Sequence, residues 1–589
     1  MFPRISTVRS GGKTYQYLRI VESHRDGNGR MHQKVVANLG RLDQMGGRLD
    51  MLVEKLRKFC EAHFVLPEEI SNEEAVCWGP ILVIRRLWEE LELDRIIGRL
   101  CQGRRIFPVA EHAFVLVANR ICGGKKQKSE HGMGRWLESM YVCDSQGKRY
   151  LPDWLPAEEI SKEQRVKISW EQLNEWYRTL DAVWEQKNSI EKELYLNLRD
   201  LFHLKADLVF YDVTSIYFER REPKGKLRRH GHNRDGKARN VQVLLGVVLV
   251  GGFPIASHIF EGNKADKSTA KAVIKDVQER FGLKQIVFVA DKGMISPENR
   301  EFLEALEDYH YILGHPGRRD EQARGWLAQI GEKWIACPRG TQVQEVDSGR
   351  EGLRVLVAES EERKDFEAAM RDRSMKRAEA HLQKVAEAVE NGRVKKPDKI
   401  GARAARALQR DKGYRYFSYE VGGPGQFRYY RDEAKLEAEM EREGRYILTT
   451  DQLTMSAEEI VAHYKELSDI EDGFRSIKDI IEARPVHHKT DPRVCAHLFI
   501  SVLAQVLIRQ LRVHLQKADS YLSAPDAIEA MKSLGVATLN IDGKREILAG
   551  GMSRDARRVL QILGINDTRP PGSLRAAKNV APEDHVMTN

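Results

Sequence analysis

The chain has 589 residues, which at roughly 150 residues per domain predicts about four structural units and excludes a peptide hormone, a small disulfide scaffold and a single-module binder. Hydrophobic residues make up 41% of the chain and charged residues 31%, the balance of a folded globular protein rather than a disordered one. The formal net charge of +9 does not by itself indicate a nucleic-acid partner, because phosphate binding depends on local clusters of Lys and Arg.

The N-terminal third divides into two kinds of pattern. Strand-type alternation at 15–20 and 32–36 flanks the turn sequence of residues 26–29, which predicts a small basic β-hairpin followed by a linker over residues 1–75. From 76 to 200, apolar residues such as Ile81, Ile84 and Leu87 recur at helical spacing. We therefore expect a helical N-terminal region there.

The next segment, residues 201–316, changes to short β-rich runs. The predicted elements are strands at 208–211, 241–250 and 255–260, a helix at 267–281, a strand at 286–290, a helix at 297–306 and a strand at 309–313. Three meandering strands followed by helix, strand, helix and strand form an α/β layer.

Residues 317–449 have the pattern of an insertion, with strands near Trp334 and Leu353, a long charged helix over about 361–391 and a strand pair around 414–430. The basic stretch from Arg393 to Lys412 fits a phosphate contact and a solvated helix face equally well.

The C-terminal part is predicted to be helical. A capping box, Ser456-x-x-Glu459, starts a helix, and residues 450–510 are expected to complete the unit begun at 201–316. Residues 511–589 are expected to be helical with a loose tail from Arg569. The apolar runs 241–250 and 494–508 are shorter than the roughly 18 to 20 residues of a membrane span, so we expect buried elements.

The seven cysteines are scattered, and none of them forms the C-x-x-C spacing of a zinc or redox site. We expect them to be reduced core residues in a reducing compartment. The first nine residues contain Arg4 and Arg9 and no apolar stretch of signal-peptide length, so secretion is not expected.

Two aspartates lie at the predicted strands. Asp212 follows the apolar run 208–211, where a carboxylate costs several kcal/mol unless it is paired or binds a cation. Asp291 directly follows the run 286–290; ligands bind at such strand ends in α/β sheets, although Asp is also an ordinary helix cap there.

A third carboxylate, Glu471, belongs to the helix that starts near Ser456. Tyr464, Glu471 and Lys478 are spaced by seven residues, which places an acid, a phenol and a cation almost on one line of the helix. A boundary salt bridge between Glu471 and Lys478 is the plain alternative. Three carboxylates without a His or Cys cluster suit Mg²⁺ or Mn²⁺, and two such ions about 3.5 to 4 Å apart support phosphoryl transfer.

These blocks resemble a known family. Tyr211-Asp212-Val213-Thr214-Ser215, Val289-Ala290-Asp291-Lys292-Gly293-Met294 and Tyr464-x6-Glu471-x6-Lys478 are similar to the three signature blocks of DDE transposases of the bacterial insertion-sequence-four superfamily. The strings Ile470-Glu471-Asp472-Gly473-Phe474-Arg475 and Arg484-Pro485-Val486-His487-His488 resemble one branch of it, as does the N-terminal hairpin ending at Asn38-Leu39-Gly40-Arg41. Leu467 departs from the Y-R-E-K pattern, which has Arg at this position to contact phosphate; Lys465 and Arg475 are candidate substitutes.

The resemblance implies a ribonuclease-H-like catalytic domain made of 201–316 and 450–510, interrupted by the 317–449 insertion. It implies that Asp212, Asp291 and Glu471 are the catalytic residues and hold two Mg²⁺ ions, for which Mn²⁺ can substitute. The implied partners are double-stranded DNA, at transposon ends and target, and a second copy of the chain in the active complex. The implied location is the bacterial cytoplasm, at the nucleoid.

Cations concentrate where this interpretation requires them. Between Arg221 and Asn240 there are eight Lys or Arg against two acids, in a loop directly after the Asp212 strand. The plain alternative for this loop is surface disorder. For the cations and histidines expected after the third carboxylate, the plain alternative is that His487 and His488 form a solvated surface pair. The residues expected to bind DNA are Arg228, Arg229, Arg234, Lys237, Arg239, Tyr464, Arg475, Lys478, His487 and Lys489.

The sequence thus leads to the hypothesis of a cut-and-paste DNA transposase that cleaves element ends and joins the 3′-hydroxyls to target DNA. No Walker phosphate loop, dinucleotide fingerprint, H-E-x-x-H or G-x-S-x-G motif occurs in a functional context. Two alternatives stay open: a metal-dependent nuclease or resolvase of the same fold, and a DNA-binding protein whose catalytic residues are idle.

Overall fold

The computed structural model describes all residues except 28, 47–50, 52, 54–69, 124–128, 156–167, 205–207, 219–220, 232–238, 265–268, 283–285, 291–296, 307, 316, 319, 468–485, 487, 542–543, 572 and 574–589. The chain divides into two compact units. Unit 1 comprises Met1–Ala75, Ala537–Leu548 and Leu574–Asn589, and unit 2 comprises Val76–Val536 and Ala549–Ser573.

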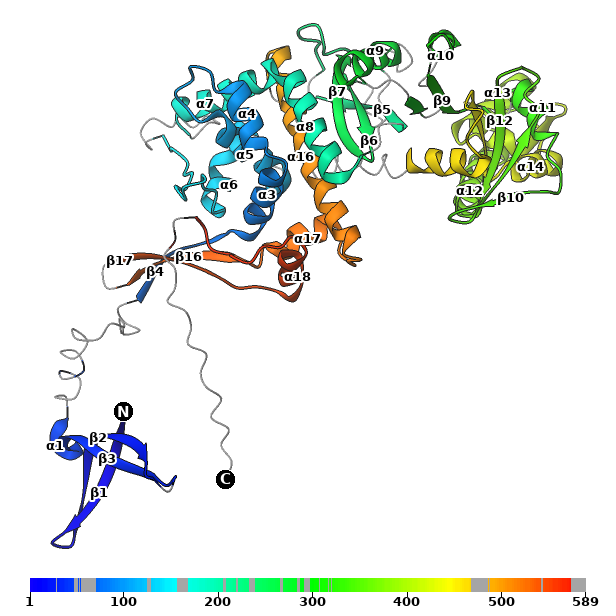
Figure 1. Ribbon diagram of the computed structural model, residues 1–589. Coiled ribbons are helices and arrows are strands. Elements are labelled where there is room, and N and C mark those ends of the chain that lie inside the picture. The colour runs from blue at the N-terminus through cyan, green and yellow to red at the C-terminus, as the bar shows by residue number, and fades with distance from the viewer. Residues whose placement is uncertain are drawn as a thin grey trace. The chain divides into compact units, whose positions relative to one another are not determined.

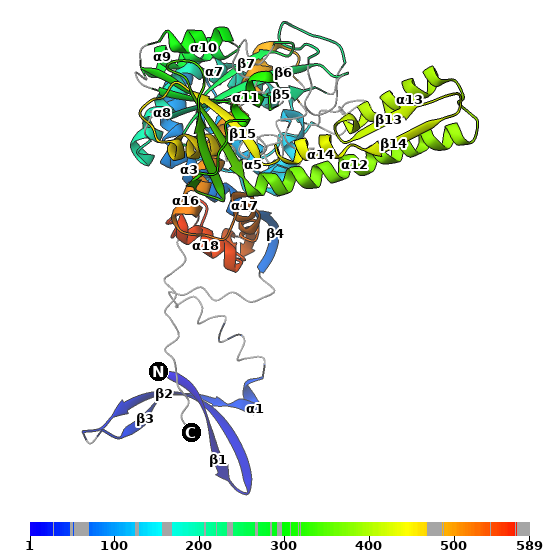
Figure 2. The same ribbon diagram turned by 90° about the vertical axis from the view of Figure 1, so that its right-hand side faces the viewer.

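Unit 1 contains an antiparallel sheet of β1 (Phe2–Ser10), β2 (Lys13–Arg25) and β3 (Met31–Arg41), followed by α1 (Leu42–Met45) (Figure 2). The predicted hairpin is β2–β3, whose turn is closed by the Asp26 N–H donating to the Arg30 carbonyl. The sequence prediction missed β1, because nearly all of its side chains are exposed and leave no apolar alternation. Pro3 is tolerated because β1 is an edge strand.

The predicted helical region is confirmed in unit 2 (Figure 1). It consists of α3 (Gly79–Glu90), α4 (Leu93–Cys101), α5 (Val109–Cys122), α6 (Met133–Ser139), α7 (Trp170–Glu185) and α8 (Lys187–Phe202), with the 3-10 turn η2 (Glu130–Gly132). Helix α5 is buried along almost its whole length and contacts α3, α4 and α7. An apolar helix surrounded in this way is a core element.

The predicted α/β layer is also confirmed. It consists of β5 (Leu208–Tyr217), β6 (Gln242–Val250), β7 (Phe253–Glu261), α9 (Ala270–Phe281), β8 (Ile286–Ala290), α10 (Pro297–Glu304) and β9 (Tyr309–Gly314). The strands lie in the order β7-β6-β5-β8-β9. Strand β5 is central, antiparallel to β6 and parallel to β8, and β8 is parallel to β9.

One face of this sheet packs against α9 and α10. Alternate residues of β5, among them Tyr211 and Val213, pack with buried residues of α9 and with Leu303 of α10. The Tyr211 hydroxyl donates to Thr269 Oγ1 at 2.8 Å, and Thr269 is the residue before α9. The ring lies over Gly246 of β6, where a Cβ atom would stand 2.7 Å from the hydroxyl oxygen. Tyr211 therefore fixes α9 against the sheet next to Asp212.

The region predicted as an insertion continues the same sheet. Its elements are α11 (Glu321–Leu327), β10 (Ile335–Cys337), β11 (Thr341–Val346), β12 (Arg354–Ser360), α12 (Glu361–Glu390), α13 (Pro397–Arg410), β13 (Phe417–Val421), β14 (Phe427–Arg431), α14 (Glu433–Met440) and β15 (Arg445–Thr450). Strand β15 pairs with β9, so the full order is β10-β11-β12-β15-β9-β8-β5-β6-β7. The paired ribbon β13–β14 is separate from this sheet.

The C-terminal part is helical only in places. The capping box is confirmed, since the Ser456 N–H donates to Glu459 Oε2 and the Glu459 N–H donates to Ser456 Oγ. The helices are α16 (Asp491–Lys517), α17 (Ala524–Met531) and α18 (Arg554–Ile562). The prediction of helix throughout was wrong for β16 (Gly535–Ile541) and β17 (Lys544–Gly550), which pair in the order β17-β16-β4 with β4 (Ile70–Cys77). Their partner lies over 450 residues earlier, beyond any local pattern.

Among the described residues, α16 is the one helix long and apolar enough to cross a membrane, and 94% of its most apolar window is buried inside the protein. It contacts α5, α7 and β7, which is the behaviour of a core helix, as the sequence predicted. The prediction that the cysteines are reduced core residues is confirmed for Cys101, Cys143 and Cys495, which are buried and in no disulfide. Cys77, Cys122 and Cys337 are also in no disulfide but are only partly buried, and Cys60 lies outside the described residues.

Candidate functional site around Asp212

Asp212 is the candidate catalytic residue that the structure describes. It is half-buried in the middle of β5, between Tyr211 and Val213, which are almost fully buried. Side chains alternate along a strand, so Asp212 faces away from the Tyr211 core. Its Oδ1 accepts the Val213 N–H at 2.7 Å. A carboxylate thus stands on an interior strand of the nine-stranded sheet, at the level where β5 pairs with Val247 of β6.

The other two predicted acids lie outside the described residues. Asp291 immediately follows the last residue of β8, and Glu471 falls within the segment 468–485. The same holds for five of the residues predicted to bind DNA, which are Arg234, Lys237, Arg475, Lys478 and His487.

The helix that begins after Ser456 is described as far as Leu467. Tyr464 is half-buried, and its ring stacks on Tyr446 of β15 with 5.8 Å between centroids. Leu467 is only 4% exposed. The position where the resembled pattern has Arg therefore faces the protein interior, where a guanidinium would need a partner. Lys465, a candidate substitute, donates from Nζ to the Arg339 carbonyl at 3.1 Å.

Arg228, predicted to contact phosphate, is instead buried at 3% exposure. Its Nε donates to the Lys224 carbonyl, and its two Nη atoms donate to the carbonyls of His488 and Lys489 and to Asp491 Oδ1, at 2.7 to 3.2 Å. Every branch of the guanidinium is therefore used within the protein. The geometry favours a structural role for Arg228 over the predicted DNA contact.

Asp491, the first residue of α16, completes this connection. Its Oδ2 accepts the backbone N–H groups of Lys226 at 2.6 Å and Leu227 at 3.2 Å. Gly225 has φ +67, and a Cβ there would stand 2.3 Å from the Asp491 carboxylate oxygens. We call the contacts among Gly225–Arg228 and His488–Asp491 the Arg228 latch. It joins the loop after the Asp212 strand to the residues that lead into α16.

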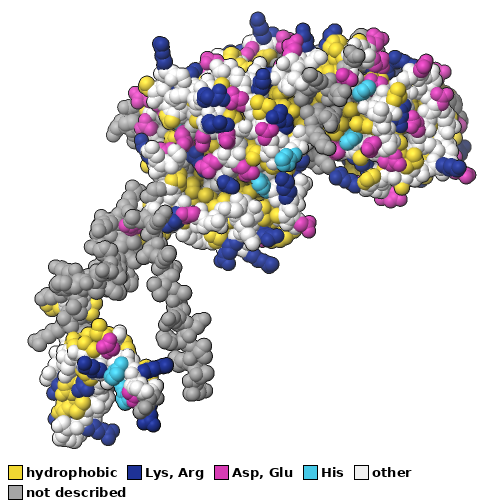
Figure 3. Space-filling model, in the orientation of Figure 1, with side chains coloured by type: hydrophobic (Ala, Val, Ile, Leu, Met, Phe, Trp, Pro, Cys, Tyr) yellow, Lys and Arg dark blue, Asp and Glu magenta, His cyan; other side chains and the backbone are white. Residues whose placement is uncertain are grey.

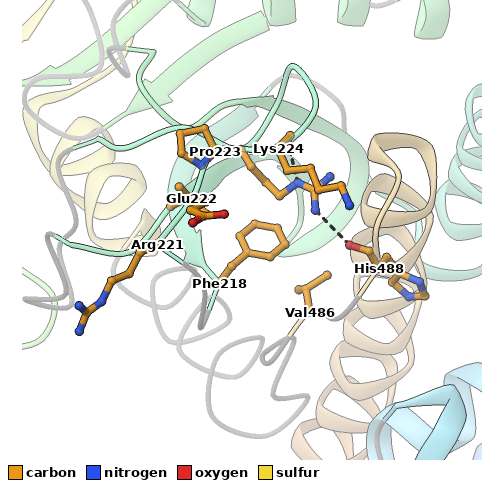
Figure 4. A pocket seen from close by; sticks show the side chains of 9 residues that line it. Phe218, Arg221, Glu222, Pro223, Lys224, Val486 and His488 are labelled. Atoms are coloured by element: carbon orange, nitrogen blue, oxygen red, sulfur yellow. Dashed lines mark hydrogen bonds between the residues drawn. The ribbon is translucent and has the colours of Figure 1, made fainter. Parts of the chain in front are cut away.

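A cavity of about 270 Å³ lies beside the Arg228 latch (Figure 4). Its apolar wall includes Phe218 and Val486, and its charged wall includes Arg221, Lys224 and Glu222. In Figure 4 Phe218 and Val486 lie across from each other beneath the Arg228 to His488 hydrogen bond. The cavity therefore lies where β5 ends and α16 is about to begin.

The remaining described cations differ in their availability. Arg239 and Lys489 are exposed, whereas Arg229 is half-buried and donates to the carbonyls of Gly225 and Arg228. On the face of unit 2 drawn in Figure 3, basic and acidic side chains are interspersed. On this face, phosphate binding would depend on a local cluster of cations.

A second buried group of polar side chains lies next to the latch. Glu130 Oε1, His488 Nε2 and His497 Nδ1 are separated by 3.2 to 3.9 Å, and all three residues are buried. Arg120 Nη2 lies 3.1 Å from His497 Nδ1 and 3.5 Å from Glu130 Oε1. Burial alone would raise the pKa of Glu130, but His488 and Arg120 outweigh it and hold that pKa well below its usual range. We call these four residues the Glu130 cluster.

The Glu130 cluster offers three atoms suited to a metal ion, and sequence reasoning did not find it. However, the Arg120 guanidinium already contacts two of the three atoms, so a positive charge occupies the position that a metal would take. The opposite charges of Glu130 and Arg120 therefore balance each other without a metal ion. Its members come from positions as far apart as 120 and 497, and no local spacing relates them.

Comparison with known proteins agrees with the resemblance of the signature blocks. Residues 3–70 match the family described as "IS1634 family transposase, N-terminal domain", and residues 203–507 match the family described as "Transposase DDE domain". No curated protein matched. A cryo-EM structure of the piggyBac transposase synaptic complex with hairpin DNA aligns with a TM-score of 0.34 and 8% identity, over 77% of this chain and 79% of that chain. Because the DDE match spans more than half of the 589 residues, the chain belongs to the DDE transposase family.

Proposed function

We propose that this protein is a cut-and-paste DNA transposase that cleaves insertion-sequence ends and joins their 3′-hydroxyls to target DNA. The catalytic groups in this proposal are Asp212, Asp291 and Glu471, in a ribonuclease-H-like unit of the insertion-sequence-four superfamily. The partners are the transposon ends and target DNA in duplex form, and a second copy of the chain, because two ends must be cut together. The place of action is the bacterial nucleoid.

The observation that carries this proposal is the register between β5 and β8. The parallel pairs are Leu208 with Val287, Val209 with Phe288 and Phe210 with Val289, each 79 residues apart in sequence. Asp212 and Asp291 are also separated by 79 residues. Paired residues of parallel strands point to the same face, so a continuation of this register sets the two carboxylates side by side. Two unrelated acids would match the strand register only by chance.

The order of strands supports the same proposal. An antiparallel meander β5-β6-β7 is followed by two parallel strands on the other side of β5. Asp212 lies on β5, and in sequence Asp291 directly follows the last residue of β8, the parallel neighbour of β5. Ligands of α/β sheets bind outside the carboxyl ends of the strands.

The donor set fits a hard divalent cation. Asp212 is a half-buried carboxylate among apolar neighbours, an environment in which a negative charge is stabilised by a cation. Asp212, Asp291 and Glu471 would hold Mg²⁺, and Mn²⁺ has the same oxygen preference. When bound, a pair of such ions activates the attacking oxygen and stabilises the leaving one.

The chain's own contribution is positioning. The Tyr211 hydrogen bond to Thr269 and the buried neighbours on both sides hold the β5 backbone, and hence the Asp212 carboxylate, in a fixed orientation. Tyr464 lies seven residues before Glu471 in the sequence and stacks on Tyr446. Exposed Arg239 and Lys489 are available to phosphate.

The test is cleavage of DNA that carries the element's terminal sequences, in the presence of Mg²⁺. Asp212→Asn should lower the cleavage rate by at least about 10³-fold while end binding is kept, because electrostatic stabilisation of the transition state supplies most of such catalysis. A change of the same type at an exposed acid, Asp398→Asn, should leave cleavage unchanged. Normal cleavage by Asp212→Asn would refute the assignment.

A strand-transfer assay separates this proposal from its rivals. A nuclease or resolvase would cut end DNA without joining it to a target, and an idle DNA-binding protein would do neither. The transposase should yield products in which the 3′-end is covalently joined to target DNA.

A further inference from the structure

A line of cations runs along the exposed face of α13. Lys399, Arg403, Arg406 and Arg410 are all exposed and follow one another at intervals of four, three and four residues. At about 100° and 1.5 Å per residue, the four lie within about 60° of one another around the helix and extend over about 16 Å. We call these four residues the α13 stripe.

The charge of the α13 stripe is not neutralised in the part of the protein that the structure describes. Among the residues that the structure describes, no carboxylate forms an ion pair with any of the four. On the neighbouring helix α12, by contrast, Arg363 pairs with Glu367 and Arg371 pairs with Glu443. The flanking cations Arg393, Lys395, Lys396 and Lys412 are also exposed, and in residues 393–412 only Asp398 and Asp411 are acidic.

The opposite face of α13 is firmly packed. Ile400, Ala404, Ala407 and Leu408 are buried, and α13 contacts α12 and β13. The Tyr419 hydroxyl of β13 donates to the Gly401 carbonyl, and Leu408 packs with Phe417 in one core cluster. Figure 2 shows α12, α13 and the β13–β14 ribbon lying side by side. The stripe is therefore presented on a rigid support rather than on a loose tail.

Apart from Gln409, the exposed residues between the cations are small. Ala402 and Ala405 are exposed among them, and Gln409 is the one exposed side chain from 399 to 410 that combines a donor and an acceptor without charge. The cations consequently stand clear of their surroundings, and from 399 to 410 no exposed side chain other than Gln409 and the cations themselves could hydrogen-bond a base edge. Contacts of this kind fix a nucleic-acid backbone and carry no sequence information.

We propose that the α13 stripe binds the phosphate backbone of duplex DNA without sequence preference, and so holds target or flanking DNA rather than the recognised element end. This inference rests on the proposed function, which supplies the DNA. The match is one of charge and spacing: at about 3.4 Å of rise per phosphate, 16 Å covers about five phosphates of one strand. Four neutralised phosphates release their condensed counterions, which makes this binding strongly salt-dependent.

The test compares two full-length variants with an equal loss of charge. The stripe variant is Lys399→Gln/Arg403→Gln/Arg406→Gln/Arg410→Gln. The control variant changes four exposed cations that are scattered around the neighbouring helix α12, and is Lys364→Gln/Arg373→Gln/Lys376→Gln/Lys384→Gln. Affinity for a random-sequence duplex is measured by fluorescence anisotropy at several salt concentrations, and thermal melting checks the fold of each variant.

The stripe variant should lower the slope of log affinity against log salt by about 3 to 4, because each contacted phosphate contributes about 0.9 to that slope. The control variant should change it by less than one unit. A third variant, Arg403→Lys/Arg406→Lys/Arg410→Lys, keeps the charge and should retain the slope. Cleavage of saturating end DNA by the stripe variant should be unchanged.

Three outcomes would overturn the inference: equal slopes for stripe and control variants, a loss restricted to element-end DNA, or a change of oligomeric state without a change in DNA affinity. These outcomes are independent of the proposed function. If Asp212→Asn abolishes cleavage while the stripe variant keeps its slope, only the stripe assignment fails; if Asp212→Asn cleaves normally, the proposed function fails and the slope result still reports on α13.

Discussion

At the scale of single residues, Arg228 shows how burial decides between two roles for one cation. It lies in a loop with many exposed cations, yet its guanidinium donates hydrogen bonds to the carbonyls of His488 and Lys489 and to the carboxylate of Asp491. Arg228→Gln leaves Asp491 without its charged partner. We expect this to lower the free energy of unfolding by about 3 kcal/mol, because breaking a largely buried pair leaves an uncompensated charge. Thermal melting and urea unfolding measure the loss.

Exposed Arg239 provides the matched control. Arg239→Gln should change stability by less than about 0.5 kcal/mol, as is usual for surface substitutions, and should weaken DNA binding in a salt-dependent way. The opposite result for Arg228→Gln, namely unchanged melting with weakened DNA binding, would restore the phosphate contact that its sequence context predicted.

His112 is a second residue whose surroundings set its chemistry. It is 4% exposed, stacked on Phe107 and in ring contact with Trp176, and burial lowers its pKa to about 4. The unfolded chain takes up this proton near pH 6.5. The contribution of neutral His112 to the free energy of unfolding is therefore fully present above pH 6.5 and is lost as the pH falls towards 4. At pH 4.5 we expect a loss of about 2 kcal/mol relative to pH 7.

His112→Phe keeps a ring in the same place and removes the proton site. Urea unfolding at pH 7 and pH 4.5 should show that the variant loses about 2 kcal/mol less than the natural protein between these pH values. An identical pH dependence in both proteins would mean that His112 is protonated without penalty in the folded state.

At the scale of elements, the contact between β5, β6 and α9 depends on the absence of one side chain. Gly246→Ala places a Cβ 2.7 Å from the Tyr211 hydroxyl and 3.0 Å from its ring. We expect destabilisation of about 1 to 3 kcal/mol, the usual cost of overpacking a core. Tyr211→Phe should cost less in the Gly246→Ala background than in the natural protein, with a coupling above about 0.5 kcal/mol.

Gly325 provides the control for this experiment. It lies in α11 with open space at the Cβ position, so Gly325→Ala should be neutral or stabilising by up to about 1 kcal/mol. Additive effects of Gly246→Ala and Tyr211→Phe, measured by urea unfolding, would show that the ring moves aside and does not fix α9.

The sequence predicted elements well where a local pattern specifies them. The strand and helix order from β5 to β9 follows directly from apolar runs and turns, and the Ser456 capping box follows from a four-residue signal. The prediction from sequence failed for β1, whose side chains are exposed, and for β16 and β17, whose partner β4 is remote in the sequence. It also did not show that β10–β12 and β15 join the sheet of β5, because sheet membership depends on the β9–β15 pairing and not on composition.

At the scale of the whole molecule, the sequence likewise predicted the parts of the candidate site that follow from local motifs, but not the contacts between remote segments. The motif spacing singled out Asp212 and Asp291, and their separation equals the offset of the β5–β8 register. The Arg228 latch and the Glu130 cluster join segments that are about 260 and 377 residues apart, as measured from Arg228 to His488 and from Arg120 to His497. Only tertiary structure reveals such pairs. Both converge on His488, so the segment that leads into α16 is held from two directions.

The Glu130 cluster yields the last prediction, because α5, η2 and α16 all depend on it. Glu130→Gln removes the only negative charge beside fully buried Arg120 in the described part of the cluster. We expect a loss of about 3 kcal/mol, since an unpaired buried cation remains. In buffer without added Mg²⁺ or Mn²⁺, EDTA should leave the melting temperature of the natural protein unchanged, because Arg120 supplies the positive charge in the cluster. If zinc raised that temperature and EDTA lowered it, while Glu130→Gln abolished both effects, the cluster would be a metal site and Arg120 would have to move out of it.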